Sequence, residues 1–193
     1  MPLEKKFNID DALKHAMDVF WVFGFEASST QKLLASMNIN RGSLYATFGN
    51  KQSLFIKALR LYIISYQTKS LDMLSNIFAP CEAITQLFQQ VIASALADDE
   101  RRGCFLVNTL LDLSAHEQEV QKLATAAIDQ IELFFNVQIA AGQNTGAISK
   151  SIDKQKAASA LLGLLLGIRV LSRIDPNKER LIAIQIQAEN ILV

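Results

Sequence analysis

The chain has 193 residues, of which half are hydrophobic and a fifth are charged, and its formal net charge is zero. This composition excludes a disordered chain, because enough apolar surface is present to form a buried core. Two cysteines are too few for a disulfide-stapled secreted domain.

Eight glycines and three prolines separate long stretches of helix-forming residues. The apolar residues in these stretches recur at spacings of three and four, which is typical of one face of a helix. We therefore expect an all-α protein of about nine helices, with no internal repeat.

Charge is distributed unevenly along the chain. Residues 1–69 contain nine Lys and Arg against five Asp and Glu, whereas residues 70–193 contain ten against fourteen. A basic first third favours contact with an anionic partner, such as nucleic acid, at that end of the chain. Ordinary scatter of surface charge is the alternative explanation.

No secretion signal and no membrane span are expected. Lys5 and Lys6 are followed by acidic residues rather than by an apolar core. The most apolar segment, residues 157–168, is shorter than the roughly 20 residues that a membrane span needs. The sequence therefore predicts a buried helix at this segment and a protein that resides in the reducing cytoplasm.

Four helices are predicted in the first 77 residues. Their ranges are 9–23, 29–37, 40–46 and 51–77. The polar residues placed to cap their N-termini are Asn8, Ser29, Asn40 and Asn50. Gly24 follows the first helix, where a left-handed residue is favoured.

Five further helices are predicted after Pro80. Their ranges are 81–97, 103–114, 117–142, 152–173 and 177–192. Pro176 is placed at the first helical position of the last one. We therefore expect a small N-terminal domain of residues 1–50 and a second helical domain of residues 51–193.

Residues 28–51 contain the strongest functional pattern. Two short helices joined by a turn of about three residues form a helix-turn-helix, a motif whose second helix enters the DNA major groove. The apolar residues predicted to set the angle between them are Leu33, Leu34, Met37, Ile39, Leu44 and Phe48. Between these positions, Arg41 can reach a guanine edge or a phosphate, while Ser43 and Thr47 can donate hydrogen bonds.

Residues 39–51 read Ile-Asn-Arg-Gly-Ser-Leu-Tyr-Ala-Thr-Phe-Gly-Asn-Lys. This segment resembles the recognition segment of TetR-family transcriptional regulators. The preceding stretch ends in Phe23-Gly24-Phe25 and is similar to that family's first helix and its Gly-aromatic turn. The resemblance covers about residues 7–60 and implies a regulator with an N-terminal DNA-binding domain and a second domain that dimerises and senses a ligand.

The resemblance also implies roles for individual residues. The DNA-binding set is Ser29, Thr30, Arg41, Gly42, Ser43, Tyr45, Thr47 and Lys51. In this set Tyr45 would lie against the sugar-phosphate backbone and Lys51 would bind a phosphate. Thr47 departs from the family, which commonly has His or Tyr there, and the short stretch before the first helix argues against an arm in the minor groove.

Simpler interpretations of three of these residues stay open. The alternatives are that Tyr45 is a core aromatic, that Lys51 is a solvated lysine and that Arg41 is an ordinary surface residue. A lysine at the start of a helix opposes the helix dipole, which favours an external anion beside Lys51.

The helix predicted at residues 152–173 is the candidate dimer contact. Gly163 and Gly167 lie four residues apart, a spacing that lets two helix backbones approach closely. The residues assigned to the interface are Leu161, Gly163, Leu164, Gly167, Ile168 and Leu171. In the family the last two helices form a four-helix bundle with their dyad mates; a helix buried within one monomer is the alternative. A dimer would place two recognition helices roughly 34–36 Å apart on a palindromic operator.

Aromatic residues of the second domain suggest a cavity for an apolar ligand. The candidate ligand-binding residues are Tyr62, Tyr66, Phe88, Cys104, Phe105, Asn108 and Phe134. Plain core packing is the alternative for the aromatic residues, and a backbone hydrogen bond is the alternative for Asn108.

Cys104 is also a candidate sensor of electrophiles or oxidants. It follows Arg101 and Arg102 at the start of a predicted helix, an environment that favours a reactive thiolate. Residues 102–109 resemble a short motif in one subgroup of the TetR family. A small buried residue is the alternative.

These features predict a repressor that a small-molecule inducer releases from its operator. A helical ligand-binding or adaptor protein without DNA binding is the alternative. An enzyme is not expected, because the sequence shows no Ser-His-Asp set, paired carboxylates, P-loop or dinucleotide loop. No metal or cofactor is expected either, since His15 and His116 have no companion ligands nearby in the sequence.

Overall fold

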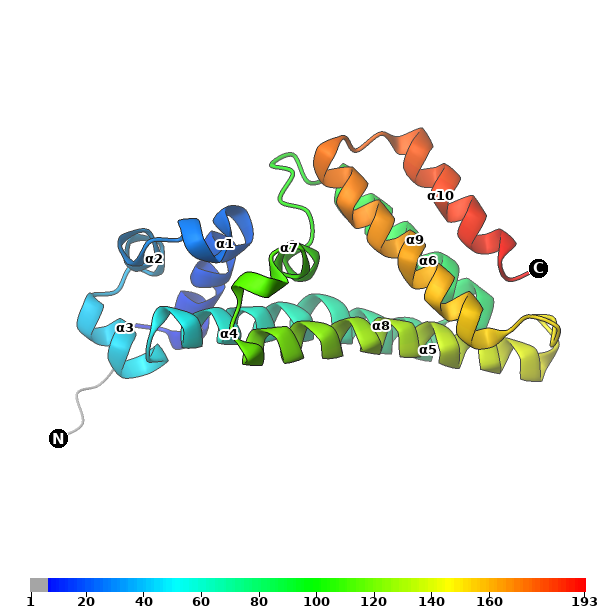
Figure 1. Ribbon diagram of the computed structural model, residues 1–193, viewed down its shortest axis with the longest axis horizontal. Helices are drawn as coiled ribbons and strands as arrows, with labels where there is room; N and C mark the ends of the chain where they lie inside the picture. Colours follow the sequence, from blue (N-terminus) through cyan, green and yellow to red (C-terminus); the bar gives the residue numbers. More distant parts are fainter. Residues whose placement is uncertain (1–6) are drawn as a thin grey trace.

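The computed structural model describes residues 7–193, and these residues form helices and no strand (Figure 1). The helices are α1 (Ile9–Ala27), α2 (Thr30–Met37), α3 (Arg41–Phe48), α4 (Lys51–Tyr62), the π-helix η1 (Ile63–Thr68), α5 (Lys69–Ile77), α6 (Pro80–Leu96), α7 (Phe105–Leu111), the 3-10 helix η2 (Leu113–Ala115), α8 (Gln118–Thr145), α9 (Lys154–Ile174) and α10 (Lys178–Asn190). Lys5 and Lys6, the basic residues noted before the first helix, lie outside the described residues.

Asparagine caps set the starts of three N-terminal helices, as the sequence predicts. The Oδ1 atom of Asn8 accepts a hydrogen bond from the backbone N–H of Asp10 at 2.9 Å. Asn40 and Asn50 each cap the helix that follows, through N–H groups three residues along, at 2.8 and 2.7 Å. Each cap satisfies a backbone donor that the first helical turn leaves without a partner.

The predicted place of Pro176 at the first helical position is wrong. Pro176 precedes Asn177, and Asn177 is the N-cap of α10. Pro80 instead occupies the first turn of a helix, α6, where its missing N–H costs no intrahelical hydrogen bond. Gly24 interrupts α1 with φ of 72°, a left-handed conformation that favours glycine.

One continuous rod, residues 51–77, connects the two ends of the molecule (Figure 1). It comprises α4, η1 and α5 without an intervening loop, so the prediction of a single helix over this range is confirmed. Counting the rod once, the described residues contain nine helices of the α type, as expected. A short π-helical insertion in an α-helix frequently occurs at a functional site.

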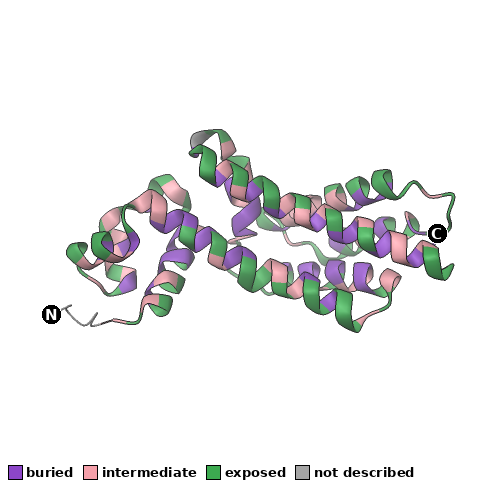
Figure 2. Ribbon diagram, turned by 90° about the horizontal axis from the view of Figure 1, so that it is seen from below, coloured by how far each residue is buried: buried purple, intermediate pink, exposed green. Residues whose placement is uncertain are grey.

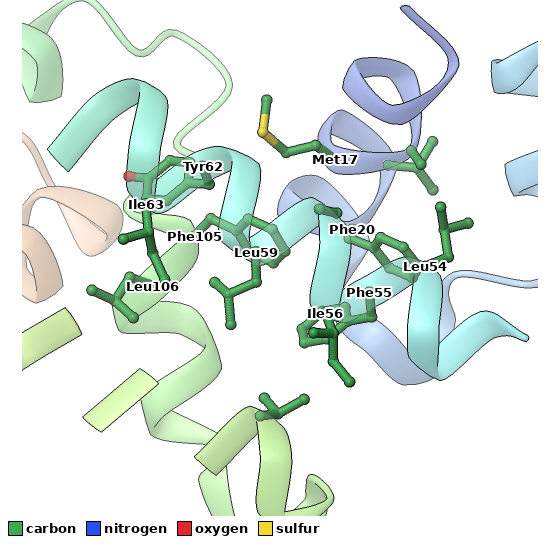
Figure 3. Close-up of a cluster of buried hydrophobic side chains, with 14 of the residues drawn as sticks. Met17, Phe20, Leu54, Phe55, Ile56, Leu59, Tyr62, Ile63, Phe105 and Leu106 are labelled. Atoms are coloured by element: carbon green, nitrogen blue, oxygen red, sulfur yellow. The ribbon is translucent and has the colours of Figure 1, made fainter. Parts of the chain in front are cut away.

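Two apolar clusters hold the helices together. The first cluster contains residues of α1, α2, α3, α4 and α7 and of the beginning of α8. Figure 3 shows side chains of α1, α4 and α7 meeting within it. The second joins α5, α6, α8, α9 and α10. In Figure 2 the buried positions follow the sides on which helices face one another. Because α4 contributes Leu54 and Phe55 to the same cluster as Phe105 of α7, the N-terminal helices are packed onto the rest of the chain.

By length and composition alone, α9 could cross a membrane, a property that core helices of soluble proteins share. One of its faces packs against α6, α8 and α10. Its buried residues are Ala157, Ala158, Leu161, Leu165, Ile168 and Ser172. In the middle of the helix, Ser159, Ala160 and Gly163 are exposed in the single chain.

His116 packs against the first cluster, and its burial predicts a pH-dependent stability. Its ring stacks on Phe55 with centroids 5.0 Å apart, and its buried Nδ1 has no hydrogen-bond partner among the described residues. Burial lowers the pKa of His116 below its ordinary value of 6.5, although the carboxylates of Asp112 and Glu26 oppose this effect. Between the two pKa values the unfolded chain binds more protons than the folded one, so acid favours unfolding.

We therefore expect the free energy of unfolding to decrease as the pH falls below about 6.5. The variant His116→Phe should lose this part of the pH dependence and keep the stacking on Phe55. Urea unfolding of both proteins at neutral and mildly acidic pH measures the difference. An identical pH dependence in the two proteins would show that His116 does not contribute.

Candidate nucleic-acid interface and cavity

The turn between α2 and α3 fixes the orientation of the second helix. Asn38 ends α2 in a left-handed conformation with φ of 51°. The backbone N–H of Ile39 then donates to the carbonyl of Leu34 at 3.2 Å. Buried Leu33 and Met37 lie on the inner side of α2. The two helices and their turn thus form the helix-turn-helix that the sequence predicts.

The helix α3 has a buried side and an exposed side. Leu44 and Phe48 are only 1% and 2% exposed, whereas Tyr45 is 52% exposed. Arg41 is exposed and Ser43 is half-buried. The exposed side therefore presents a guanidinium, a hydroxyl and a phenol to the solvent, and the interpretation of Tyr45 as a core aromatic is wrong.

The N-terminus of α2 presents further hydrogen-bond donors. Ser29 is exposed, and its hydroxyl oxygen accepts a hydrogen bond from the N–H of Lys32 at 3.2 Å. Its O–H is left to donate outward. Thr30, the first residue of α2, is half-buried. Hydroxyls and backbone N–H groups at a helix N-terminus are suited to a phosphate oxygen.

Three lysines of this region each lie over a phenylalanine ring. The pairs are Lys32 over Phe23, Lys51 over Phe25 and Lys57 over Phe48, with Nζ-to-centroid distances of 3.5, 4.4 and 5.5 Å. Within residues 7–193 none of the three forms an ion pair. The sequence prediction includes Lys51 but neither Lys32, which lies within the motif on α2, nor Lys57, which lies on α4 beyond the motif.

A cavity of about 680 Å³ lies among α1, the 51–77 rod, α6, α7, α8 and α9. This volume suits a small molecule. One wall of the cavity is aromatic, because the ring of Trp21 lies 4.9 Å from that of Tyr62 and 5.8 Å from that of Tyr66. Trp21 belongs to α1, so the cavity reaches a helix of the N-terminal region.

Three of the seven predicted ligand-binding residues line this cavity: Tyr62, Tyr66 and Cys104. The other four do not. Phe88, Phe105 and Phe134 are buried in the two apolar clusters, as the core-packing alternative has it. Asn108 donates to the carbonyl of Arg102 at 2.8 Å, which is the backbone hydrogen bond considered for it.

Cys104 borders the cavity as a buried residue. The hydroxyl of Tyr62 lies 3.3 Å from its Sγ atom. Burial raises the pKa of Tyr62 well above its ordinary value of 10, so this hydroxyl stays protonated and donates to the sulfur. Arg102 points elsewhere: its guanidinium lies 4.6 Å from the centroid of the Trp21 ring and pairs with Asp98 at 3.4 Å. The sensor interpretation assumed arginines beside the thiol, whereas Arg102 is engaged with Trp21 and Asp98.

Several polar residues of the cavity have no counterpart in the sequence prediction. They include Gln90 and Ser94 of α6 and Arg169 of α9. The hydroxyl of Ser94 accepts a hydrogen bond from Arg169 at 3.0 Å. These two residues lie 75 positions apart in the chain, and no local pattern indicates that they meet.

Two family models match separate parts of the chain. Bacterial regulatory proteins of the tetR family match residues 12–58, which include the helix-turn-helix. The tetracyclin repressor-like C-terminal domain matches residues 80–184, which is more than half of the chain. The chain belongs to the TetR family. It is a DNA-binding transcriptional regulator.

Relatives of this TetR-family regulator span nearly its whole length. The uncharacterized HTH-type transcriptional regulator YezE of Bacillus subtilis is 27% identical and covers 94% of both chains. The HTH-type transcriptional repressor ComR of Escherichia coli is 27% identical over 93% of this chain and 86% of that protein. A cysteine mutant of the TetR-family regulator CifR, solved with a 26-bp operator DNA, is 29% identical, with a TM-score of 0.85 and 97% of each chain covered.

In this TetR-family regulator, the predicted dimer residues divide between the two faces of α9. Leu161 and Ile168 have no exposed surface and belong to the chain's own core, so their assignment to the interface is wrong. A Cβ atom added at Gly163 or Gly167 would meet nothing within 4 Å. Leu164, like Leu171, is half-buried. Periodicity identified α9 as apolar around most of its circumference, but it could not separate the two faces.

Proposed function

We propose that this regulator is a homodimeric repressor and that a small molecule, bound in the cavity, releases it from a palindromic operator. The exposed side of α3 carries this proposal: Arg41, Ser43 and Tyr45 face outward, while Leu44 and Phe48 anchor the helix from behind. CifR with operator DNA and the repressor ComR are relatives that support it. Action on DNA inside the cell agrees with a cytoplasmic location.

DNA recognition divides between base edges and phosphates in this proposal. Arg41 reads a guanine edge in the major groove, and Gly42 and Ser43 allow the helix backbone to approach closely. Ser29, Thr30, Tyr45 and Lys51 contact the sugar-phosphate backbone and set the register, with Thr47 at the edge of the contact. The amino group of Lys51 hydrogen-bonds a backbone carbonyl at 3.4 Å, and it can turn from there to a phosphate.

Dimerisation takes place through α9 and α10. Gly163 and Gly167 open one face of α9 to a second backbone. The same end of the chain exposes Ile174, Ile182 and Ile186, which are 68%, 37% and 48% exposed. An apolar surface of this kind favours association with a second copy.

Ligand binding and DNA binding are coupled through the wall of the cavity. Trp21 of α1 donates from Nε1 to the carbonyl of Gly103 at 3.1 Å, which ties the N-terminal region to the segment before α7. A ligand that pushes against Trp21 or the 51–77 rod favours a different placement of α1 to α4. If that placement no longer matches the spacing of successive major grooves, the ligand favours the DNA-free state.

The test is binding to the DNA upstream of the protein's own gene. Fluorescence anisotropy should show tighter binding to this duplex than to a shuffled duplex of equal length and composition. Affinity should fall steeply as salt increases, because phosphate contacts release counterions. Equal affinity for both duplexes, or binding that salt does not weaken, would contradict the proposal and favour the adaptor alternative.

A further inference from the structure

The charged residues of the cavity are mostly basic. The lining contains Lys69, Arg102 and Arg169 against one carboxylate, Asp98. Asp98 pairs with Arg102 at 3.4 Å and also accepts the backbone N–H of Gly103 at 2.9 Å. Arg102 is therefore paired, and it also lies 3.6 Å from Glu100, which is outside the lining. Lys69 and Arg169 remain, and neither forms an ion pair with any residue from 7 to 193.

Arg169 is the better placed of the two cations. It is half-buried on α9, whereas Lys69 is exposed. Its side chain makes one hydrogen bond within the described chain, from NH1 to the neutral hydroxyl of Ser94 at 3.0 Å. A guanidinium has five N–H donors, so most of them stay available. A partly desolvated cation without a counter-ion favours an anionic ligand.

The rest of the lining favours a flat, apolar molecule. Tyr62 and Tyr66 are stacked with centroids 5.1 Å apart, and Trp21 meets both rings edge-on. Aliphatic residues of α6 and α9, among them Val91 and Leu165, complete this surface. Aromatic faces of this kind bind planar ring systems well.

We propose that the cavity binds a planar, apolar molecule with one anionic group, which Arg169 receives while the ring system lies against Trp21, Tyr62 and Tyr66. This inference rests on the proposed function, because it assigns a chemical class to the inducer of the same site. It excludes cationic inducers, which Lys69 and Arg169 would repel.

Trp21 allows a direct test, because it is the only tryptophan in the chain and it lines the cavity. The anionic probe is 1-anilinonaphthalene-8-sulfonate, and its neutral match is N-phenyl-1-naphthylamine, which has the same rings without the sulfonate. Quenching of Trp21 fluorescence gives the affinity for each probe. We expect the sulfonate to bind about tenfold more tightly, as a charge-assisted hydrogen bond provides.

Variants of Arg169 locate the effect. Arg169→Gln keeps a donor for Ser94 but removes the charge. It should lower the affinity for the sulfonate about tenfold and leave the affinity for the neutral probe nearly unchanged. Arg169→Lys should retain most of the preference for the anionic probe over the neutral one. This variant tests the role of the charge even if the glutamine variant does not fold. The matched control is Arg173→Gln, one turn further along α9, where Arg173 hydrogen-bonds Asn108 outside the cavity lining.

Three results would overturn this inference. They are the absence of quenching by either probe, equal affinity of the wild type for the two probes, and an equal loss of affinity for the two probes in Arg169→Gln. Operator binding, measured in the same samples without a probe, separates this outcome from failure of the proposed function. A protein that binds its operator but shows no preference for the anion contradicts the ligand class alone.

Discussion

The double substitution Gly163→Arg and Gly167→Arg should convert the proposed dimer into a monomer and lower operator affinity by about 10²–10⁴-fold, because binding of the second half-site is no longer intramolecular. At both positions an added Cβ atom would meet nothing within 4 Å in the single chain. The substituted chain should therefore stay folded. Against a partner helix the two charges would be buried without counter-ions, which opposes association.

Sedimentation gives the oligomeric state of this variant, and anisotropy with the operator gives its affinity. Ala126→Arg is the matched control, since it adds the same side chain at an exposed position of α8. The control should remain a dimer with unchanged affinity. A double variant that still sediments as a dimer would place the interface away from this face of α9.

Replacing Arg41 with alanine should lower operator affinity by about 10- to 100-fold, since a bidentate contact to a guanine contributes about 1–3 kcal/mol of discrimination. Affinity for a shuffled duplex should change much less, because phosphate contacts remain. The guanidinium lies on the exposed side of α3, away from buried Leu44 and Phe48, so the fold should be unaffected.

Arg60→Ala is the control for the loss of one positive charge. Arg60 forms an exposed ion pair with Glu119 at 3.2 Å, which links α4 to α8. Exposed pairs contribute little to stability, and this one lies outside the helix-turn-helix. If Arg41→Ala loses equal affinity for the operator and for the shuffled duplex, Arg41 binds a phosphate rather than a base.

Sequence alone determined the features that depend on neighbouring residues. A cap requires a polar side chain and an N–H group two or three positions further along, so Asn8, Asn40 and Asn50 could be identified without a structure. The same holds for the alternation of Leu44 and Phe48 with Arg41 and Tyr45 on one short helix. The helix-turn-helix and the family resemblance follow from this local order.

Only the tertiary structure decided which distant residues meet. Apolar periodicity marks a helix face but does not say whether that face contacts its own chain or a partner. For this reason the pattern predicts Leu161 and Ile168 at the dimer interface, although they lie in the core. The cavity depends on the packing of six elements, which brings Trp21 and Arg169 into one lining. Such contacts arise from the packing of whole helices, and no spacing within one segment of the chain records them.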